Sequence, residues 1–248
     1  MKSLGSYLLF IGNLFTRMEV FNIYVKRTID EAVKIGINSL TLVAIVSTFI
    51  GMVSTVQTAA NLVSAFIPRS VVSLVVRDMT ILELAPTITS IVLAGKVGSN
   101  IAGELGTMRI SEQIDALEVM GINSASYLIL PKVLGAMLMF PLLVIVAGFL
   151  SLYGGYLVGT ALNVVTGQEF VAGLRTEFQQ YSVFMALVKS VVFAFLISTI
   201  SAYQGFFTRG GALEVGQAST TAVTNSCIAV LISDYVVAQF LLTLMSNG

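Results

Sequence analysis

Charged side chains gather in one stretch of this otherwise apolar chain. Between Leu93 and Asn123 they follow one another at short intervals, and long uncharged runs lie on both sides: Lys96, Glu104, Arg109, Glu112, Asp115 and Glu118. Such groups can form ion pairs, carry protons or dock a charged partner. They are costly in lipid, so the stretch must lie outside the bilayer or line a protected interior. We therefore expect it to contact something other than lipid.

The first half of this stretch repeats small residues at helical spacing. They form two adjoining strips, Ala94, Gly98, Ala102 and Gly106 on one and Gly95, Ser99 and Gly103 on the other. Such faces let a second helix backbone approach closely, which favours association in lipid. A phosphate-binding glycine loop is the alternative, but the G-x-x-x-x-G-K-[ST] pattern is absent, because Val97 follows Gly95 and Lys96. Tight helix packing is the favoured interpretation.

The second half predicts a short amphipathic helix over 111–120, with Ser111 as its cap and Gly121 as its stop. An apolar face and an acidic face recur at helical spacing, Ile110, Ile114, Leu117 and Met120 on one and Glu112, Asp115 and Glu118 on the other. Like charges at this spacing repel one another, and a basic groove on a partner would relieve that repulsion. A solvated helix face is equally consistent with the spacing.

The composition is that of an all-α integral membrane protein. Of 248 residues, 56% are hydrophobic and 10% charged, with a mean hydropathy of +0.93, whereas soluble domains carry about a quarter charged residues. A net charge of zero argues against nucleic acid as a partner. The chain has no histidine, and its single cysteine, Cys227, excludes an internal disulfide. No catalytic residue, metal site or cofactor of its own is expected.

Apolar runs divide the chain into an N-terminal segment and about five membrane spans. Residues 1–34 fit an amphipathic helix at the membrane surface better than a signal peptide, and 35–248 form the transmembrane domain. The spans are expected at about 40–63, 78–100, 133–168, 182–207 and 212–245, and a short amphipathic helix outside the bilayer at 163–181. Pro141 is expected to kink the third span. Most lysines and arginines then fall on the side of the N-terminus, which predicts that it is cytoplasmic.

Two polar features lie within the predicted spans. Glu83 is an ionisable residue in the second span, so it is a functional candidate or, equally, one half of a buried ion pair. The fifth span begins with hydroxyl groups, including Thr220, Thr221 and Thr224, which must face other helices or a cavity rather than lipid.

Two motifs resemble the signature of the MlaE family, the permease subunits of Mla/Mce-type lipid ABC transporters. They are ELAP at 83–86 and LAGKVGSNIAGELGTMRISEQIDALEVMGI at 93–122. The resemblance extends from about Ile35 to the C-terminus, where Asp234 matches an acidic residue of the family's last helix. It implies that the cytoplasmic coupling helix, which docks on the ATPase, contains Glu112, Gln113, Asp115, Leu117, Glu118, Met120 and Gly121.

The resemblance also implies partners and a substrate. The expected assembly is a homodimer with two ATPase subunits, which bind ATP and magnesium, and a ring of periplasmic MCE-domain proteins. It would sit in the inner membrane of a Gram-negative bacterium, move phospholipid between the inner and outer membranes and maintain outer-membrane lipid asymmetry. A lipid needs a largely apolar cavity with a few polar groups, for which the candidates are Phe49, Met52, Glu83, Thr220, Thr221 and Thr224.

Two other functions are considered. A stand-alone secondary transporter or channel would use Glu83, Lys96, Glu104 and Asp234 as ion or proton sites, but the sequence shows no two halves with corresponding broken segments. A membrane assembly scaffold would use the acidic helix only to recruit a partner.

Overall fold

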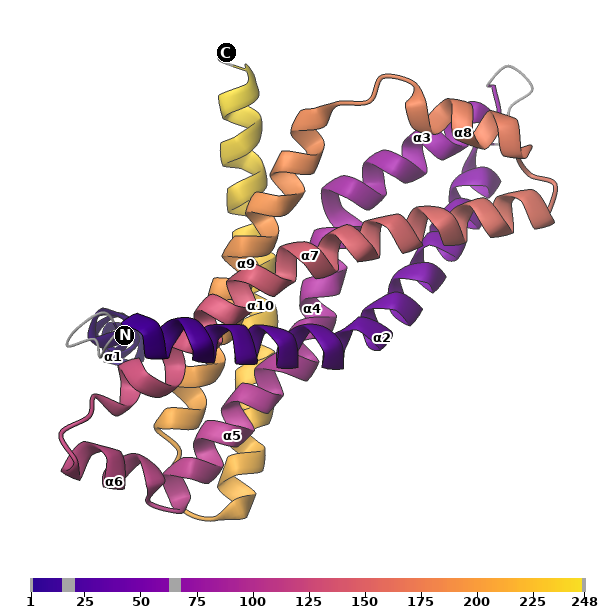
Figure 1. Ribbon diagram of the computed structural model, residues 1–248. Coiled ribbons are helices and arrows are strands. Elements are labelled where there is room, and N and C mark those ends of the chain that lie inside the picture. The colour runs from indigo at the N-terminus through magenta and orange to yellow at the C-terminus, as the bar shows by residue number, and fades with distance from the viewer. Residues whose placement is uncertain (1, 15–20, 63–67, 247–248) are drawn as a thin grey trace. The chain divides into compact units, whose positions relative to one another are not determined.

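The computed structural model describes residues 2–14, 21–62 and 68–246, and every regular element among them is helical (Figure 1). The elements are α1 (Lys2–Leu14), α2 (Phe21–Asn61), α3 (Ser70–Met79), the π-helical η1 (Thr80–Ile88), α4 (Thr89–Leu93), the π-helical η2 (Ala94–Gly98), α5 (Ser99–Ile110), α6 (Gln113–Val119), α7 (Ser124–Ala161), α8 (Gly167–Arg175), α9 (Gln180–Phe206) and α10 (Ala212–Ser246). The expectation of an all-α membrane protein is confirmed.

Four helices in the described ranges are long and apolar enough to cross a membrane, namely 24–61, 124–161, 180–206 and 212–240. They correspond to four of the five predicted spans. The remaining predicted span lies in the stretch Ser70–Ile110, where α3, η1, α4, η2 and α5 follow one another without a gap. A count of five spans stays a prediction.

The N-terminal segment differs from the prediction of one surface helix over 1–34. Helix α1 ends at Leu14, and α2 begins at Phe21 and continues to Asn61, so the charged residues of 26–34 belong to the same helix as the first span. The prediction for 15–20 lies outside the described residues. The charges of 26–34 did not break the helix because lysine, arginine and glutamate are good helix formers.

The chain forms two compact units, each built from parts of several helices. The first unit comprises Met1–Ser39, Ser90–Phe140 and Val191–Val236. In it, Phe10 of α1 packs against Tyr203 and Phe206 of α9, and against Phe207 directly after it, at ring-centre distances of 5.5–5.6 Å. Tyr7 adds a 2.7 Å hydrogen bond with the hydroxyl of Thr199. These contacts hold α1 against α9.

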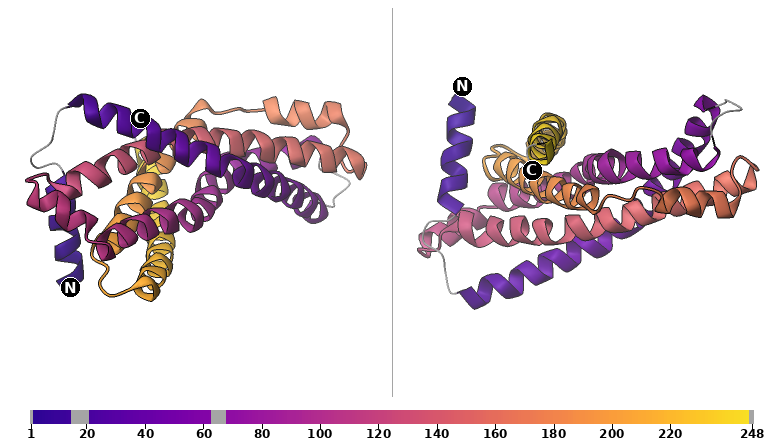
Figure 2. Two further views of the ribbon diagram at one scale, coloured as in Figure 1. Left: turned by 60° about the horizontal axis from the view of Figure 1, so that its bottom comes forward. Right: turned by 90° about the horizontal axis from the view of Figure 1, so that it is seen from above.

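The second unit comprises Leu40–Thr89, Pro141–Ser190 and Val237–Gly248. Helices α3 and α8 pack together there (Figure 1), and Val72, Val76, Val165 and Phe170 form a buried cluster. The buried guanidinium of Arg77 donates to the carbonyls of Leu174 and Thr176 at 3.0 and 2.6 Å, just where α8 ends. Helices α2 and α7 run alongside each other (Figure 2), with Gly154 against the Thr48 backbone.

Helix α8 confirms the predicted short helix between the third and fourth apolar runs. The hydroxyl of Thr166 accepts from the N–H of Glu169, and the Glu169 carboxylate accepts in return from the N–H of Thr166, which is a capping box. The Thr166 backbone N–H, and next its hydroxyl, hold the pKa of the Glu169 carboxyl below its ordinary value.

Two prolines lie within the long helix α7, which continues through Pro131 and Pro141 without a break. The kink predicted at Pro141 stays a prediction. A third proline, Pro86, lies inside η1, one of two stretches in which helical turns widen to π geometry. A proline removes a backbone donor, and a wider turn is one way for a helix to accommodate it.

Candidate functional site

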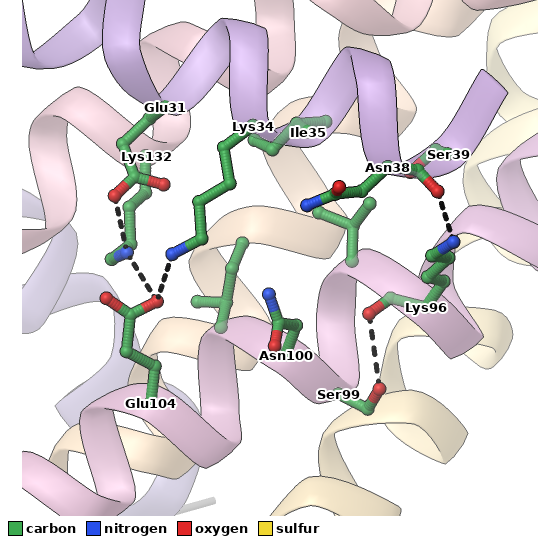
Figure 3. Close-up of a pocket in the computed structure, with 12 residues that line it drawn as sticks. Glu31, Lys34, Ile35, Asn38, Ser39, Lys96, Ser99, Asn100, Glu104 and Lys132 are labelled. Carbon is green, nitrogen blue, oxygen red and sulfur yellow. Dashed lines mark hydrogen bonds and ion pairs between the residues drawn. The ribbon is translucent and has the colours of Figure 1, made fainter.

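A polar cavity of about 370 Å³ opens in the first unit between α2, η2, α5 and α7 (Figure 3). Three lysines and two glutamates reach it: Glu31, Lys34, Lys96, Glu104 and Lys132. They come from three separate stretches of sequence, and the fold brings them to one place. The central charged stretch therefore lines a polar cavity over part of its length, and its place relative to the bilayer stays a prediction.

Lys132 of α7 is the centre of the charge network. Its ammonium lies 2.9 Å from Glu31 Oε1 and 2.8 Å from Glu104 Oε2, and only 4% of its side chain is exposed. Lys34 approaches the same Glu104 oxygen at 3.2 Å. A buried ammonium needs such compensation, since an isolated buried charge is very costly. The network ties α2, α5 and α7 together.

The opposite side of the cavity is formed by Lys96, which η2 carries. Its ammonium donates to the backbone carbonyl of Asn38 on α2 (Figure 3). The hydroxyl of Ser99 donates to the carbonyl of Gly95, one turn earlier. The π-helical turn 94–98 thus presents Lys96 toward α2, and π-bulges are frequent at functional sites.

Below the cavity, α5 ends in a sharp turn into α6 (Figure 1). Gly121 stops α6 as predicted: its φ is +81°, its N–H donates to the Glu118 carbonyl, and the N–H of Ile122 donates to that of Leu117. This is a Schellman motif, in which glycine is favoured. Ser111 is not the cap. Glu112 takes that position with φ of 59° and no side-chain cap, while the Ser111 hydroxyl donates back to the Thr107 carbonyl.

The faces of α6 are only partly those expected. Ile114 is fully buried and Leu117 half-buried, but Met120 is 65% exposed, and Val119 beside it is 89% exposed. The exposed surface of this segment, which we call the α6 surface, contains Glu112, Gln113, Asp115, Glu118, Val119, Met120 and Gly121. It combines an acidic row with two apolar side chains.

Two of the acids on the α6 surface already have partners. Asp115 pairs with Arg109 at 2.6 Å, and Glu118 accepts from the Ser124 hydroxyl at 2.8 Å. Arg109 thus relieves part of the repulsion that the acidic row predicts.

Small residues of η2 and α5 pack against α9 and α10 within the first unit. A Cβ on Gly98 would lie 2.8 Å from the Ser201 hydroxyl, one on Gly103 3.4 Å from that of Ser219, and one on Gly106 3.1 Å from Val215. Ala102 is fully buried, and its carbonyl lies where a Cβ on Gly205 would be. Gly95 differs, because a Cβ there would meet nothing within 4 Å. Of the predicted packing positions, all but Gly95 therefore lie close to atoms of α9 or α10.

In the second unit, Glu83 is one half of an ion pair. Its Oε1 lies 2.9 Å from Lys189 Nζ, and its other oxygen accepts from the Thr87 hydroxyl at 3.4 Å. Lys189 is 1% exposed, and the Glu83 side chain is 51% exposed. Of the two readings that the sequence left open, the ion pair is the one observed. Phe49 and Met52 of α2 also lie in this unit, Phe49 exposed and Met52 half-buried.

The threonines of α10 lie in the first unit. Thr220, Thr221 and Thr224 are exposed, and each hydroxyl donates to the carbonyl four residues earlier at 2.8–3.1 Å. In the single chain the helix backbone thus satisfies these hydroxyls, and the expectation that they face other helices or a cavity stays a prediction.

Comparison with known proteins assigns the chain to a family. The profile described as "Permease MlaE" matches residues 28–240. A probable ABC transporter permease protein of Rickettsia bellii is 35% identical over 96% of this chain and 92% of its own length. A probable ABC transporter permease protein of Synechocystis is 34% identical over 96% of this chain and 88% of its own length. The chloroplastic protein TRIGALACTOSYLDIACYLGLYCEROL 1 of Arabidopsis thaliana is 33% identical over 92% of this chain and 65% of its own length. The chain belongs to the MlaE permease family.

As an MlaE permease, the chain is a multi-pass membrane subunit of an ABC transporter, whose ATPase is a different subunit. The α6 surface lies on a short helix between the helical stretch Ser70–Ile110 and α7, which is long and apolar enough to cross a membrane.

The sequence did not identify the ion-pair partners of two lysines of the MlaE permease, Lys132 and Lys189. Lys132 is the only charged residue between Glu118 and Glu169, and Lys189 the only one between Glu177 and Arg209. A single ionisable residue in a long apolar run is expensive, so each isolated lysine signalled a carboxylate partner. The spacing could not say which carboxylate that was.

Proposed function

We propose that this permease moves phospholipid between the inner and outer membranes of a Gram-negative cell and so maintains outer-membrane lipid asymmetry. It acts as a homodimer in the inner membrane, with its N-terminus in the cytoplasm. Two ATPase subunits that bind ATP and magnesium power it, and MCE-domain proteins receive or deliver lipid on the periplasmic side. The permease itself has no catalytic role.

The observation that carries this proposal is the α6 surface. The helix is anchored by buried Ile114 and by the Schellman turn at Gly121, while Glu112 and Val119 stay exposed. An exposed apolar side chain beside carboxylates suits a partner groove that is apolar at its centre and basic at its rim. We assign the groove to the ATPase subunit, for which α6 is the coupling helix.

Lipid passage requires polar groups for the head and apolar groups for the tails. We assign these roles to Glu83, with its ion pair, and to Thr220, Thr221 and Thr224, with Phe49 and Met52 as the apolar part. The half-exposed Glu83 carboxylate and the exposed threonine hydroxyls support the assignment, because all of them are accessible in the single chain.

The docking assignment is tested by changing the α6 surface without breaking an internal contact. Asp115 is unsuitable because it pairs with Arg109. Glu112→Lys reverses an exposed charge, and Val119→Asp removes the exposed apolar contact. Each variant should reduce the amount of ATPase that co-purifies from mild detergent, by about 5- to 30-fold in affinity for a loss of about 1–2 kcal/mol.

Glu177→Lys is the matched control, because Glu177 is also an exposed glutamate with positive φ, 49° against 59° at Glu112. It should leave co-purification and ATP hydrolysis unchanged. Equal ATPase recovery with wild type, Glu112→Lys and Val119→Asp would show that α6 does not dock the ATPase.

A further inference from the structure

The cavity between α2, η2, α5 and α7 has no role in the function proposed above, and its charges do not cancel. Three lysines and two glutamates line it. At neutral pH this leaves one positive charge in excess, in a cavity of about 370 Å³ that also contains amides and hydroxyls. An excess charge in a partly enclosed space attracts an ion of opposite sign, because the surrounding protein screens it less than water does.

The two carboxylates are neutralised within the network. Glu31 and Glu104 both accept from Lys132, at 2.9 and 2.8 Å, and Glu104 also accepts from Lys34 at 3.2 Å. Two negative charges therefore face two positive charges within hydrogen-bonding distance. They present little net repulsion to an anion on the other side of the cavity.

Lys96 carries the remaining charge. Its ammonium donates to a backbone carbonyl, that of Asn38, which is a neutral acceptor. An ammonium has three donors, and Lys96 is exposed, so its further donors can reach a ligand. No carboxylate lies within ion-pair distance of Lys96 among the described residues.

Side-chain amides add neutral donors beside Lys96. Asn38 and Asn100 are exposed, and Figure 3 shows their amides pointing into the space between α2 and α5. In the described part of the chain neither amide makes a hydrogen bond. A ligand that satisfies one ammonium and two amides needs one or two negative charges and several acceptor oxygens in different directions.

A phosphate group has this chemistry, and we propose that the cavity binds one, with Lys96 as the charged contact and Asn38 and Asn100 as neutral donors. The contacts come from side chains, so no glycine loop is needed. The phosphate belongs to a free anion or to the headgroup of an anionic lipid. Binding here does not require that the chain moves lipid, so failure of either proposal leaves the other standing.

The test measures binding to the purified full-length permease in phosphate-free detergent without ATP. The probes are inorganic phosphate, dihexanoyl phosphatidic acid and, as the matched probe without phosphate, dihexanoyl glycerol. The wild type should bind phosphatidic acid and not the glycerol lipid. Lys96→Gln should weaken binding about tenfold, which corresponds to about 1.4 kcal/mol, whereas Lys96→Arg, which keeps the charge, should bind. Lys26→Gln, an exposed lysine of α2 outside the cavity, should bind as wild type.

The results separate the two sources of phosphate. Binding of both phosphate probes means that the anion alone suffices, and binding of phosphatidic acid alone identifies a lipid headgroup. The proposal is overturned if neither probe binds the wild type, if dihexanoyl glycerol binds as well as phosphatidic acid, or if Lys96→Gln binds like wild type. Should Lys96→Gln fail to fold, Asn100→Val decides the matter, because this exposed amide makes no internal hydrogen bond; unchanged binding would overturn the proposal.

Discussion

The two side chains of the Lys189–Glu83 ion pair differ in their exposure to solvent. The ammonium is 1% exposed and the carboxylate side chain 51% exposed, at a distance of 2.9 Å. Lys189 also donates to the Leu82 carbonyl at 3.1 Å, but a carbonyl cannot neutralise it. The Glu83 carboxylate is therefore a countercharge for a buried ammonium, whereas the carboxylate itself remains half open to solvent.

This asymmetry gives a prediction for the pair. Glu83→Gln removes one ion pair from the buried ammonium and should lower stability by about 1.5–3 kcal/mol, the usual contribution of a hydrogen bond to a charged group. Adding Lys189→Met removes that ammonium, so the double variant should be more stable than Glu83→Gln alone. Thermal unfolding in detergent measures both, with Glu177→Gln as an exposed control. A melting temperature of Glu83→Gln equal to wild type would show that the pair contributes no stability.

For single residues, the sequence indicated which ionisable side chains are unusual, but it did not indicate which residues they contact. Glu83 was identified because a carboxylate in an apolar run is rare, but Lys189 lies 106 positions away along the chain. Helical spacing tells which face a residue occupies and gives no information on which helix lies opposite. The same reason explains why Lys132 was not joined to Glu31 and Glu104 in advance.

Among the elements of the first unit, α5 and α9 approach closely. A Cβ on Gly205 would lie 2.5 Å from the Ala102 carbonyl oxygen and 2.9 Å from its Cα. These are backbone atoms, which cannot turn aside as the end of a side chain can. By contrast, the Cβ of a residue at 98 or 103 would first meet the hydroxyl of Ser201 or Ser219. Of these three glycines, Gly205 on α9 is thus the one that leaves least room for a side chain.

We therefore expect Gly205→Ala to be more harmful than its size suggests. One methyl group must push α5 and α9 apart, and overpacking of this kind costs about 1–3 kcal/mol. Gly216→Ala is the matched control, since a Cβ there meets nothing within 4 Å and alanine favours the helix over glycine. Thermal unfolding and yield in detergent should separate the two. If Gly205→Ala were as stable as Gly216→Ala, close packing at Ala102 would not limit stability.

Element boundaries were predictable where the cause is local. Gly121 ends α6 because its φ of +81° suits glycine, and Thr166 caps α8 with Glu169 at the expected spacing. Ser111 failed as a cap because α5 continues to Ile110 and the chain then turns through Glu112 in the left-handed region. Glutamate has no strong preference for that conformation, so no local signal marked the turn.

For the molecule as a whole, the exposed side chains of α10 are the observation that most favours contact with a second copy of this chain. Its exposed side chains within the first unit are both polar and apolar, among them Thr221, Asn225, Ile232 and Tyr235. The threonine hydroxyls are satisfied by their own helix, but the Asn225 amide makes no hydrogen bond in the described part of the chain. An amide that faces lipid without a partner is costly, and asparagine commonly bonds across helix interfaces in membranes.

A twofold contact along α10 whose axis passes close to Asn225 would place Asn225 of one copy near Asn225 of the other, because residues at the axis meet their own copies. We therefore expect Asn225→Cys, made with Cys227→Ser so that it holds the only cysteine, to form a disulfide-linked dimer in oxidised membranes. Phe149→Cys in the same background, an exposed position on α7, should stay monomeric on a non-reducing gel. Asn225→Ser should also weaken the dimer when its mass is measured in detergent. Absence of the Asn225→Cys crosslink, or an equally strong crosslink at 149, would mean that the two copies do not meet through this face of α10, and the amide would then need a different partner in the assembled transporter.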